Sequence, residues 1–255
     1  MQIEYAMVAL GFFAFCGGMI DAAVGGGGLV QVPALLQALP QHSLSTVLGT
    51  NKLAVLAGNV SSILSYLKKI KVVWRLMLPT MASAFVFSFL GALSVSLVPK
   101  AIMEYVVFFI LVSMAIYTFA KKDLGRVHSN IQCGTREVLL GIFFGGLVGF
   151  YDGVFGPGSG SLLLFIFVKY FGYDFLNASA SAKLINLGTF SAALLFFIPS
   201  GNVLWVIGGW VAVCNMAGAL TGTFLALRYG SGLIRILFLF LLVFLIGRMG
   251  LSILL

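Results

Sequence analysis

Long apolar segments separated by short polar stretches make up almost the whole chain. They run at positions 5–39, 44–67, 74–97, 101–120, 138–171, 174–198, 203–227 and 232–255. Most of them are close to the ~20 residues that a helix needs to cross a bilayer. The two longest are each interrupted by glycines, at 21–28 and at 152–160. This pattern predicts an all-α integral membrane protein.

Composition supports that class and excludes a water-soluble domain. Of the 255 residues, 61% are hydrophobic and 9% are charged, whereas a soluble domain carries roughly 25% charged residues. The net charge of +8 does not indicate nucleic-acid binding here, because basic residues in a membrane protein report its orientation.

The second half of the chain repeats the first at a fixed offset of 131 residues. The matches include three uncommon residue types: Asp21 with Asp152, Lys52 with Lys183, and Trp74 with Trp205. Matches of this kind indicate an internal duplication. We predict a first transmembrane repeat at 1–120, a cytoplasmic linker at 121–137 and a second transmembrane repeat at 138–255.

The basic residues favour repeats of opposite orientation. If each broken segment is a re-entrant or paired-helix hairpin, each repeat crosses the membrane three more times and the two repeats are inverted. Most basic residues then fall on the cytoplasmic side: Lys68, Lys69, Lys71, Arg75, Lys121, Lys122, Arg126, Arg136, Arg228 and Arg235. The positive-inside rule favours this arrangement over single crossings. It predicts a multi-pass membrane protein whose N- and C-termini lie on the side opposite the cytoplasm, which is the periplasmic side if the membrane is a bacterial inner membrane.

The two glycine breaks are candidate anion sites. Irregular backbone at membrane depth must face protein or a water-filled cavity, and a helix that follows a break points free N–H groups ahead. The donors and close-approach glycines are Gly25, Gly26, Gly27 and Gly28 in the first break, and Gly156, Gly158, Ser159, Gly160 and Ser161 in the second. The alternative is that these glycines only let helices pack closely.

Two lysines lie deep in apolar segments. Lys52 is nine residues into its segment and Lys183 is ten, which places both roughly 12–15 Å deep. A lysine at this depth marks a functional site by default. It binds a substrate anion or forms a structural ion pair with Asp21 or Asp152. Each aspartate can also cap the helix that follows it or carry a proton. The neighbouring Asn51, Asn59 and Asn186 are candidates to line a polar path.

The motifs GMIDAAVGGGGLVQVPAL with TNKL, and GFYDGVFGPGSGSLL with SAKL, resemble the sulfite exporter TauE/SafE family over essentially the whole chain. This resemblance implies a bacterial inner-membrane permease of two homologous halves that carries sulfite, thiosulfate or organosulfonates. It also implies that both glycine motifs and both lysines form the site. The second half has Ser181 and Ala182 before its lysine where the first has Thr50 and Asn51, so the symmetry is imperfect.

The expected mechanism is alternating access around one central anion site. The partners are a small anion, membrane lipid and, in one version, a coupling proton or ion; no cofactor, metal or nucleic acid is expected. The alternative is a cation- or proton-coupled transporter in which the aspartates hold the ion and the lysines are structural. An enzyme is not expected, since no catalytic cluster of His, Asp, Glu or activated Ser occurs.

Overall fold

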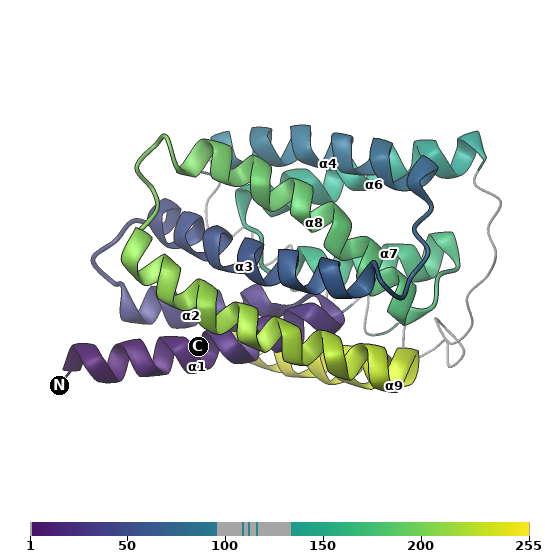
Figure 1. The fold of residues 1–255 in the computed structure, drawn as a ribbon. Coiled ribbons are helices and arrows are strands. Elements are labelled where there is room, and N and C mark those ends of the chain that lie inside the picture. Colours follow the sequence, from purple (N-terminus) through teal and green to yellow (C-terminus); the bar gives the residue numbers. More distant parts are fainter. Residues whose placement is uncertain (1, 96–108, 110–111, 113–115, 117–133, 255) are drawn as a thin grey trace.

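A computed structural model describes residues 2–95, 109, 112, 116 and 134–254 of the chain (Figure 1). All regular structure in these residues is helical. The helices are α1 (Gln2–Val24), α2 (Gly27–Ala38), α3 (Leu44–Tyr66), α4 (Trp74–Leu93), α6 (Thr135–Val154), α7 (Ser159–Phe171), α8 (Phe175–Phe197) and α9 (Trp205–Leu254). Apart from residues 109, 112 and 116, the predicted segment 101–120 lies outside the described residues, as do residues 121–133 of the predicted linker.

Six of these helices are long and apolar enough to cross a membrane. They are α1, α3, α4, α6, α8 and the first part of α9, Trp205–Gly230. Large apolar side chains such as Phe12, Leu64, Phe143 and Val206 are exposed on the outer surface, as expected where a helix faces lipid rather than water. The predicted all-helical, multi-pass membrane class is therefore confirmed.

Each broken segment folds back on itself as a helical hairpin. In the first, the side chain of Asn215 contacts both the Ala14 carbonyl of α1 and, at 2.8 Å, the Gln31 side chain of α2. In the second, the rings of Phe144 and Tyr170 lie 4.8 Å apart although one is in α6 and the other is at the end of α7. Both breaks therefore lie at the tips of hairpins inside the bundle.

The glycines allow the chain to turn at these tips. Gly25 has a φ of +75°, Gly156 of +91° and Gly158 of +90°. This left-handed region costs a residue with a Cβ atom roughly 1–2 kcal/mol, so glycine is the residue that ends α1 and starts α7 here.

Helices α3 and α8 cross the centre of the bundle in opposite directions. Near the start of α3, Thr46 donates to the Asn202 side chain beyond the end of α8, at 3.0 Å. At the end of α3, the Tyr66 hydroxyl lies 3.5 Å from that of Ser179 near the start of α8. Both helices have 23 residues and a side-chain N-cap, from Ser43 and Asp174. The N-cap residues, the first residues and the last residues of the two helices are each 131 positions apart in the sequence.

Two further helix pairs each join a helix of the first half to a helix of the second half. Helix α1 packs against α9, and α6 packs against α4. Where α4 meets α6, Gly91 lies against the Phe150 carbonyl, and where α9 meets α1, Gly222 lies against the Met19 carbonyl. Adding 131 to Met19 gives Phe150, and adding 131 to Gly91 gives Gly222. The two contacts are therefore equivalent under the offset.

Two boundaries refine the sequence-based elements. Helix α9 turns back at Gly230, where φ is 67° and ψ is −161° (Figure 1), which matches the predicted separation of 203–227 from 232–255. Helix α6 begins at Thr135, inside the predicted linker 121–137. The Glu137 carboxylate accepts a hydrogen bond from the Gly134 N–H at 2.9 Å, and this contact stabilises the earlier start.

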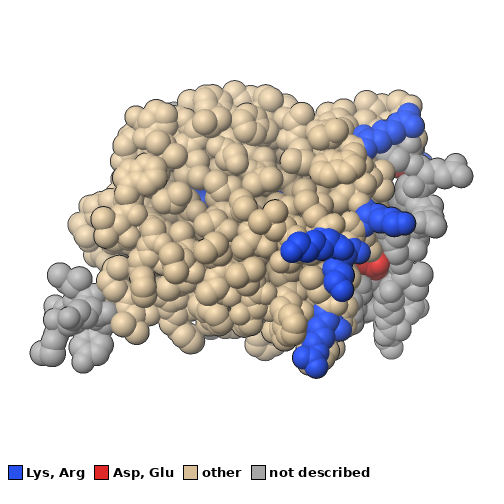
Figure 2. Space-filling model, viewed as in Figure 1, with Lys and Arg blue, Asp and Glu red and all other residues tan. Residues whose placement is uncertain are grey.

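Basic side chains gather at one end of the molecule. Figure 2 shows Lys and Arg at the right-hand end of the view, while most of the remaining surface is free of charge. In Figure 1 this is the end where α3 ends, α6 begins and α7 ends. Lys68, Lys69 and Lys71 follow α3, Arg136 is in the first turn of α6 and Lys169 is in the last turn of α7.

Candidate functional site

The tips of the two hairpins meet backbone to backbone at the centre of the bundle. A Cβ atom added to Gly160 would lie 2.8 Å from the Cα atom of Gly25, and one added to Gly25 would lie 2.7 Å from the Gly160 carbonyl oxygen. Neither residue has room for a side chain. The close packing that the alternative interpretation expected of the glycines is present at this pair.

Side-chain hydroxyl groups bind the last carbonyl groups of α1. Ser161 donates to the carbonyls of Val24 and Gly25 at 3.0 and 2.9 Å. Ser179 donates to the Ala23 carbonyl at 2.8 Å, and Tyr66 donates to that of Ala22 at 2.9 Å. The last carbonyls of a helix have no partner within it, so these hydroxyls stabilise the end of α1 away from water.

Two buried ion pairs connect the halves crosswise. The Nζ atom of Lys52 lies 2.8 Å from Oδ2 of Asp152 and also donates to the Asp152 backbone carbonyl at 2.8 Å. The ammonium group of Lys183 pairs with the Asp21 carboxylate. Lys52 is 2% exposed and Lys183 is 1% exposed, so neither ammonium group reaches solvent. The ion pairs considered from the sequence are present, and each joins a lysine of one half to an aspartate of the other.

Each aspartate also holds the break of its own hairpin. Oδ1 of Asp21 accepts a hydrogen bond from the Gly27 N–H at 3.3 Å, at the start of α2. Oδ1 of Asp152 accepts one from the Ser159 hydroxyl at 2.5 Å, at the start of α7. The sequence offered capping and pairing as separate roles. Asp21 has both in the structure, whereas Asp152 pairs with Lys52 and binds a side-chain hydroxyl of α7 rather than a backbone N–H.

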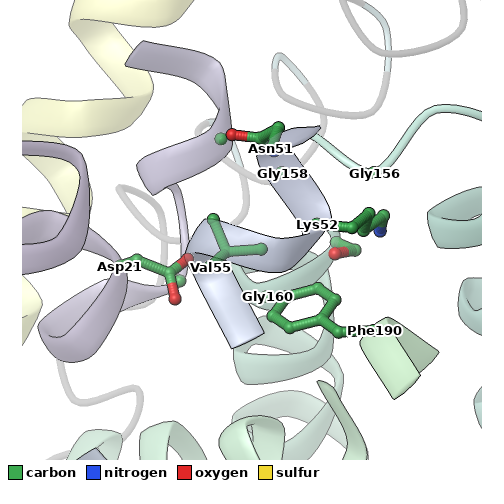
Figure 3. Close-up of a pocket in the computed structure, with 11 residues that line it drawn as sticks. Asp21, Asn51, Lys52, Val55, Gly156, Gly158, Gly160 and Phe190 are labelled. Carbon is green, nitrogen blue, oxygen red and sulfur yellow. The ribbon is translucent and has the colours of Figure 1, made fainter. Parts of the chain in front are cut away.

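A small cavity lies where the tips meet α3 and α8 (Figure 3). Its volume is about 20 Å³, which holds about one water molecule. In Figure 3, Asp21 lies to the left and Lys52 to the right, with the Phe190 ring below them. The lining residues come from both hairpins and from both central helices: Asp21, Gly25, Gly28, Asn51, Lys52, Val55, Gly156, Gly158, Ser159, Gly160 and Phe190.

The structure brings most of the predicted site residues together at this cavity. Nine of its lining residues were expected from the sequence: Asp21, Gly25, Gly28, Asn51, Lys52, Gly156, Gly158, Ser159 and Gly160. Helices α2 and α7 begin here. The first N–H groups of a helix have no partner within it and carry positive partial charge, so two helix N-termini and one ammonium group border the same space.

Other predicted residues are not among those that line the cavity. Gly27 packs against the backbone of Gly17 in α1. The Asn59 side chain donates to the Lys183 backbone carbonyl at 2.9 Å. Asn186 lies beside Gly160, and neither polar atom of its buried amide has a hydrogen-bond partner among the described residues. The predicted residues that do not line the cavity are Gly26, Gly27, Asn59, Asp152, Ser161, Lys183 and Asn186.

Two lining residues were not expected from the sequence. The Phe190 ring centroid lies 4.7 Å from Nζ of Lys52, a distance at which an aromatic face attracts a cation. Val55 lines the cavity from α3 and lies between Asp21 and Lys52 in Figure 3. An aromatic or β-branched residue in a chain that is 61% hydrophobic gives no signal in the sequence. The only sequence signal for them is their helical spacing. Val55 follows Lys52 by three residues and Phe190 follows Lys183 by seven, so each shares a helix face with its lysine.

Comparisons with known proteins agree over nearly the whole chain. A family model described as sulfite exporter TauE/SafE matches residues 10–249. The chain is 36% identical over 223 residues to the probable membrane transporter protein ORF9 of Sinorhizobium sp, covering 87% of this chain and 84% of that protein. It is 34% identical over 224 residues to the probable membrane transporter protein YfcA of Escherichia coli strain K12, covering 88% and 82%.

A third relative is a probable membrane transporter protein of Haemophilus influenzae, 31% identical over 236 residues, with 92% of this chain and 91% of that protein covered. No solved structure matches the chain. The predicted resemblance is confirmed, and it makes the protein a transporter rather than an enzyme: the chain belongs to the sulfite exporter TauE/SafE family of membrane transporters.

Proposed function

We propose that the protein carries small sulfur-containing anions, such as sulfite, thiosulfate or an organosulfonate, across the bacterial inner membrane. The observation that carries this proposal is the convergence of α2, α7 and Lys52 on one buried cavity. The family description supports the sulfur chemistry of the anion.

The chemistry of the cavity suits an oxyanion. Two helix N-termini favour negative charge, each by about 0.3–1 kcal/mol and more when partly buried. Lys52 adds a full positive charge, and Ser159 and Asn51 add side-chain polar groups. A compact oxyanion with several acceptor oxygens can bind both helix ends and the lysine at once.

Inverted repeats are the second part of the proposal. Helices α3 and α8 occupy equivalent positions in the two halves, and they run in opposite directions. In the same way, α1 of the first half packs on α9 of the second half, and α4 of the first half packs on α6 of the second half. With the basic end of the molecule in the cytoplasm, the positive-inside rule gives a periplasmic N-terminus.

The described conformation corresponds to a closed site. A cavity of about 20 Å³ holds one water molecule and excludes an anion of four or more heavy atoms. The anion therefore enters when the hairpin tips separate on one side. Rocking of one half against the other opens the site to each side in turn.

A second candidate is a cation-coupled transporter. The observation in its favour is Asp21, whose carboxylate lines the cavity beside the glycines and offers oxygen ligands to a cation. In that case Lys52 and Lys183 are structural, and sodium or protons act on the protein without any sulfur anion.

Flux into proteoliposomes separates the two candidates. We expect one or more of sulfite, thiosulfate and methanesulfonate to enter, and chloride at equal ionic strength to compete weakly. Lys52→Ala should abolish this flux, whereas Lys69→Ala, at an exposed position after α3, should not. Absence of flux for all three anions, together with a sodium- or proton-dependent change in thermal stability, would replace the anion proposal with the cation candidate.

A further inference from the structure

Lys52 is the ammonium group that borders the cavity, and Asp152 is its partner. Nζ of Lys52 lies 2.8 Å from Oδ2 of Asp152 and 4.7 Å from the centroid of the Phe190 ring. Lys183 does not line the cavity, and its ammonium group binds Asp21. An anion that enters between the hairpin tips therefore meets Lys52.

The four charges around the tips sum to zero before an anion arrives. Two lysines and two aspartates form two closed pairs. When an anion binds the ammonium group of Lys52 in place of Asp152, the Asp152 carboxylate loses its counter-charge. A monovalent anion then adds one negative charge to the site. A buried carboxylate without a counter-charge is strongly unfavourable, and such a group responds by binding a proton.

We propose that Asp152 takes up one proton for each anion that binds at Lys52, so that the protein carries the anion and the proton together. This proposal rests on the proposed function, because it requires the anion to bind at Lys52.

The hydrogen bonds of the two aspartates identify Asp152 as the proton acceptor. Oδ1 of Asp152 is held by the Ser159 hydroxyl, while Oδ2 faces Lys52 and accepts no hydrogen bond from the described residues. Asp21 keeps its partners Gly27 and Lys183 whether or not Lys52 is engaged. An anion at Lys52 therefore leaves one oxygen of Asp152 without a partner.

Lys52 on α3 pairs with Asp152, and Tyr151 is the residue before it on α6. Asp21 on α1 lines the same cavity as Lys52 and pairs with Lys183 on α8. Tyr151 is engaged, since its hydroxyl donates to the Pro157 carbonyl at 2.5 Å. The charged residues of α4 and α7, Arg75 and Lys169, lie at the helix ends away from the breaks. Among the described residues, Lys52 alone both pairs with Asp152 and borders the cavity.

The step moves a proton and no electrons. Water on the open side supplies the proton, which forms an O–H bond on Oδ2 of Asp152. The ammonium group of Lys52 exchanges that oxygen for an oxygen of the anion. A monovalent anion and a proton together add no net charge, so the loaded site is as neutral as the empty one. Release reverses both exchanges and restores the ion pair.

Proton uptake in proteoliposomes tests the coupling. Thiosulfate and methanesulfonate stay ionised near neutral pH, so a proton that enters with them travels on the protein. We expect one proton per anion, and methanesulfonate flux that does not respond to a membrane potential set with potassium and valinomycin. Flux without proton entry overturns the coupling and leaves the proposed function intact. Absence of flux for both of these anions and for sulfite overturns both proposals.

Two matched variants test the assignment to Asp152. Binding of methanesulfonate or thiosulfate, measured as protection against thermal unfolding, should strengthen about tenfold for each unit fall in pH if one proton accompanies each anion. Asp152→Asn keeps an acceptor for Ser159 and should remove both this pH dependence and the proton-to-anion ratio. Asp21→Asn should retain the ratio. A ratio lost in Asp21→Asn, or kept in Asp152→Asn, overturns the assignment.

Discussion

At the scale of single residues, the ion pairs are part predicted and part new. The depth of Lys52 and Lys183 in apolar segments predicted both as site residues, and pairing with the aspartates beside the glycines was the alternative to binding an anion. The sequence left open which lysine pairs with which aspartate. The crosswise pairs follow from the antiparallel packing of α3 and α8, which no local pattern in either segment specifies.

The Lys52–Asp152 pair gives a prediction for stability. Lys52→Met leaves the Asp152 carboxylate buried without its counter-charge, and breaking a buried pair in this way costs about 3–5 kcal/mol. Lys52→Met with Asp152→Asn should regain much of that loss, because both charges are then absent. Chemical unfolding in detergent measures the two variants. Equal stability of the single and double variants would contradict a closed ion pair.

At the scale of elements, the glycine-rich segments were predicted as helix breaks, and their roles divide in the structure. Gly25 and Gly160 line the cavity and also let the backbones of the two tips touch, whereas Gly28 and Gly156 line the cavity without such a contact between them. The sequence shows that a run of glycines breaks a helix. It does not show which glycine faces another backbone, because that depends on how one hairpin meets the other.

Two glycine substitutions test the contact between the tips. Gly160→Ala places a methyl group against the backbone of Gly25 and should destabilise the protein by about 1–3 kcal/mol, as overpacking does. Gly209→Ala in α9 meets no atom within 4 Å and should instead stabilise it by about 0.5–1 kcal/mol. The two unfolding temperatures should move in opposite directions; a parallel shift would rule out a tight contact at Gly160.

At the scale of the whole molecule, the offset of 131 residues predicted that segments 44–67 and 174–198 are equivalent, and α3 and α8 have bounds that differ by this offset. The hairpin form of the broken segments was predicted from the distribution of basic residues instead. Phe190 and Val55 were missed because apolar residues are common in every segment. The cavity between them forms when both halves are assembled, so it has no signature in either half alone.

Labelling of single cysteines tests the orientation of the molecule. Gln41 lies before α3 and Ser200 lies after α8, both exposed at the end opposite the basic residues. Gln41→Cys and Ser200→Cys should react with a membrane-impermeant maleimide from the periplasm. Lys69→Cys should react only after the cytoplasmic side is opened. Periplasmic labelling at position 69, with protection at 41 and 200, would reverse the proposed orientation.

The crosswise ion pairs also set a problem of timing during synthesis. Asp152 follows Lys52 by 100 residues and Lys183 follows Asp21 by 162. At ~5–20 residues per second, Lys52 leaves the ribosome roughly 5–20 s before its partner, and Asp21 waits longer. During that interval the new chain holds a lysine and an aspartate at membrane depth without their final partners. Insertion of the first half therefore requires a polar environment for these two side chains until the second half is inserted. The insertion machinery or a temporary contact between Asp21 and Lys52 can provide it.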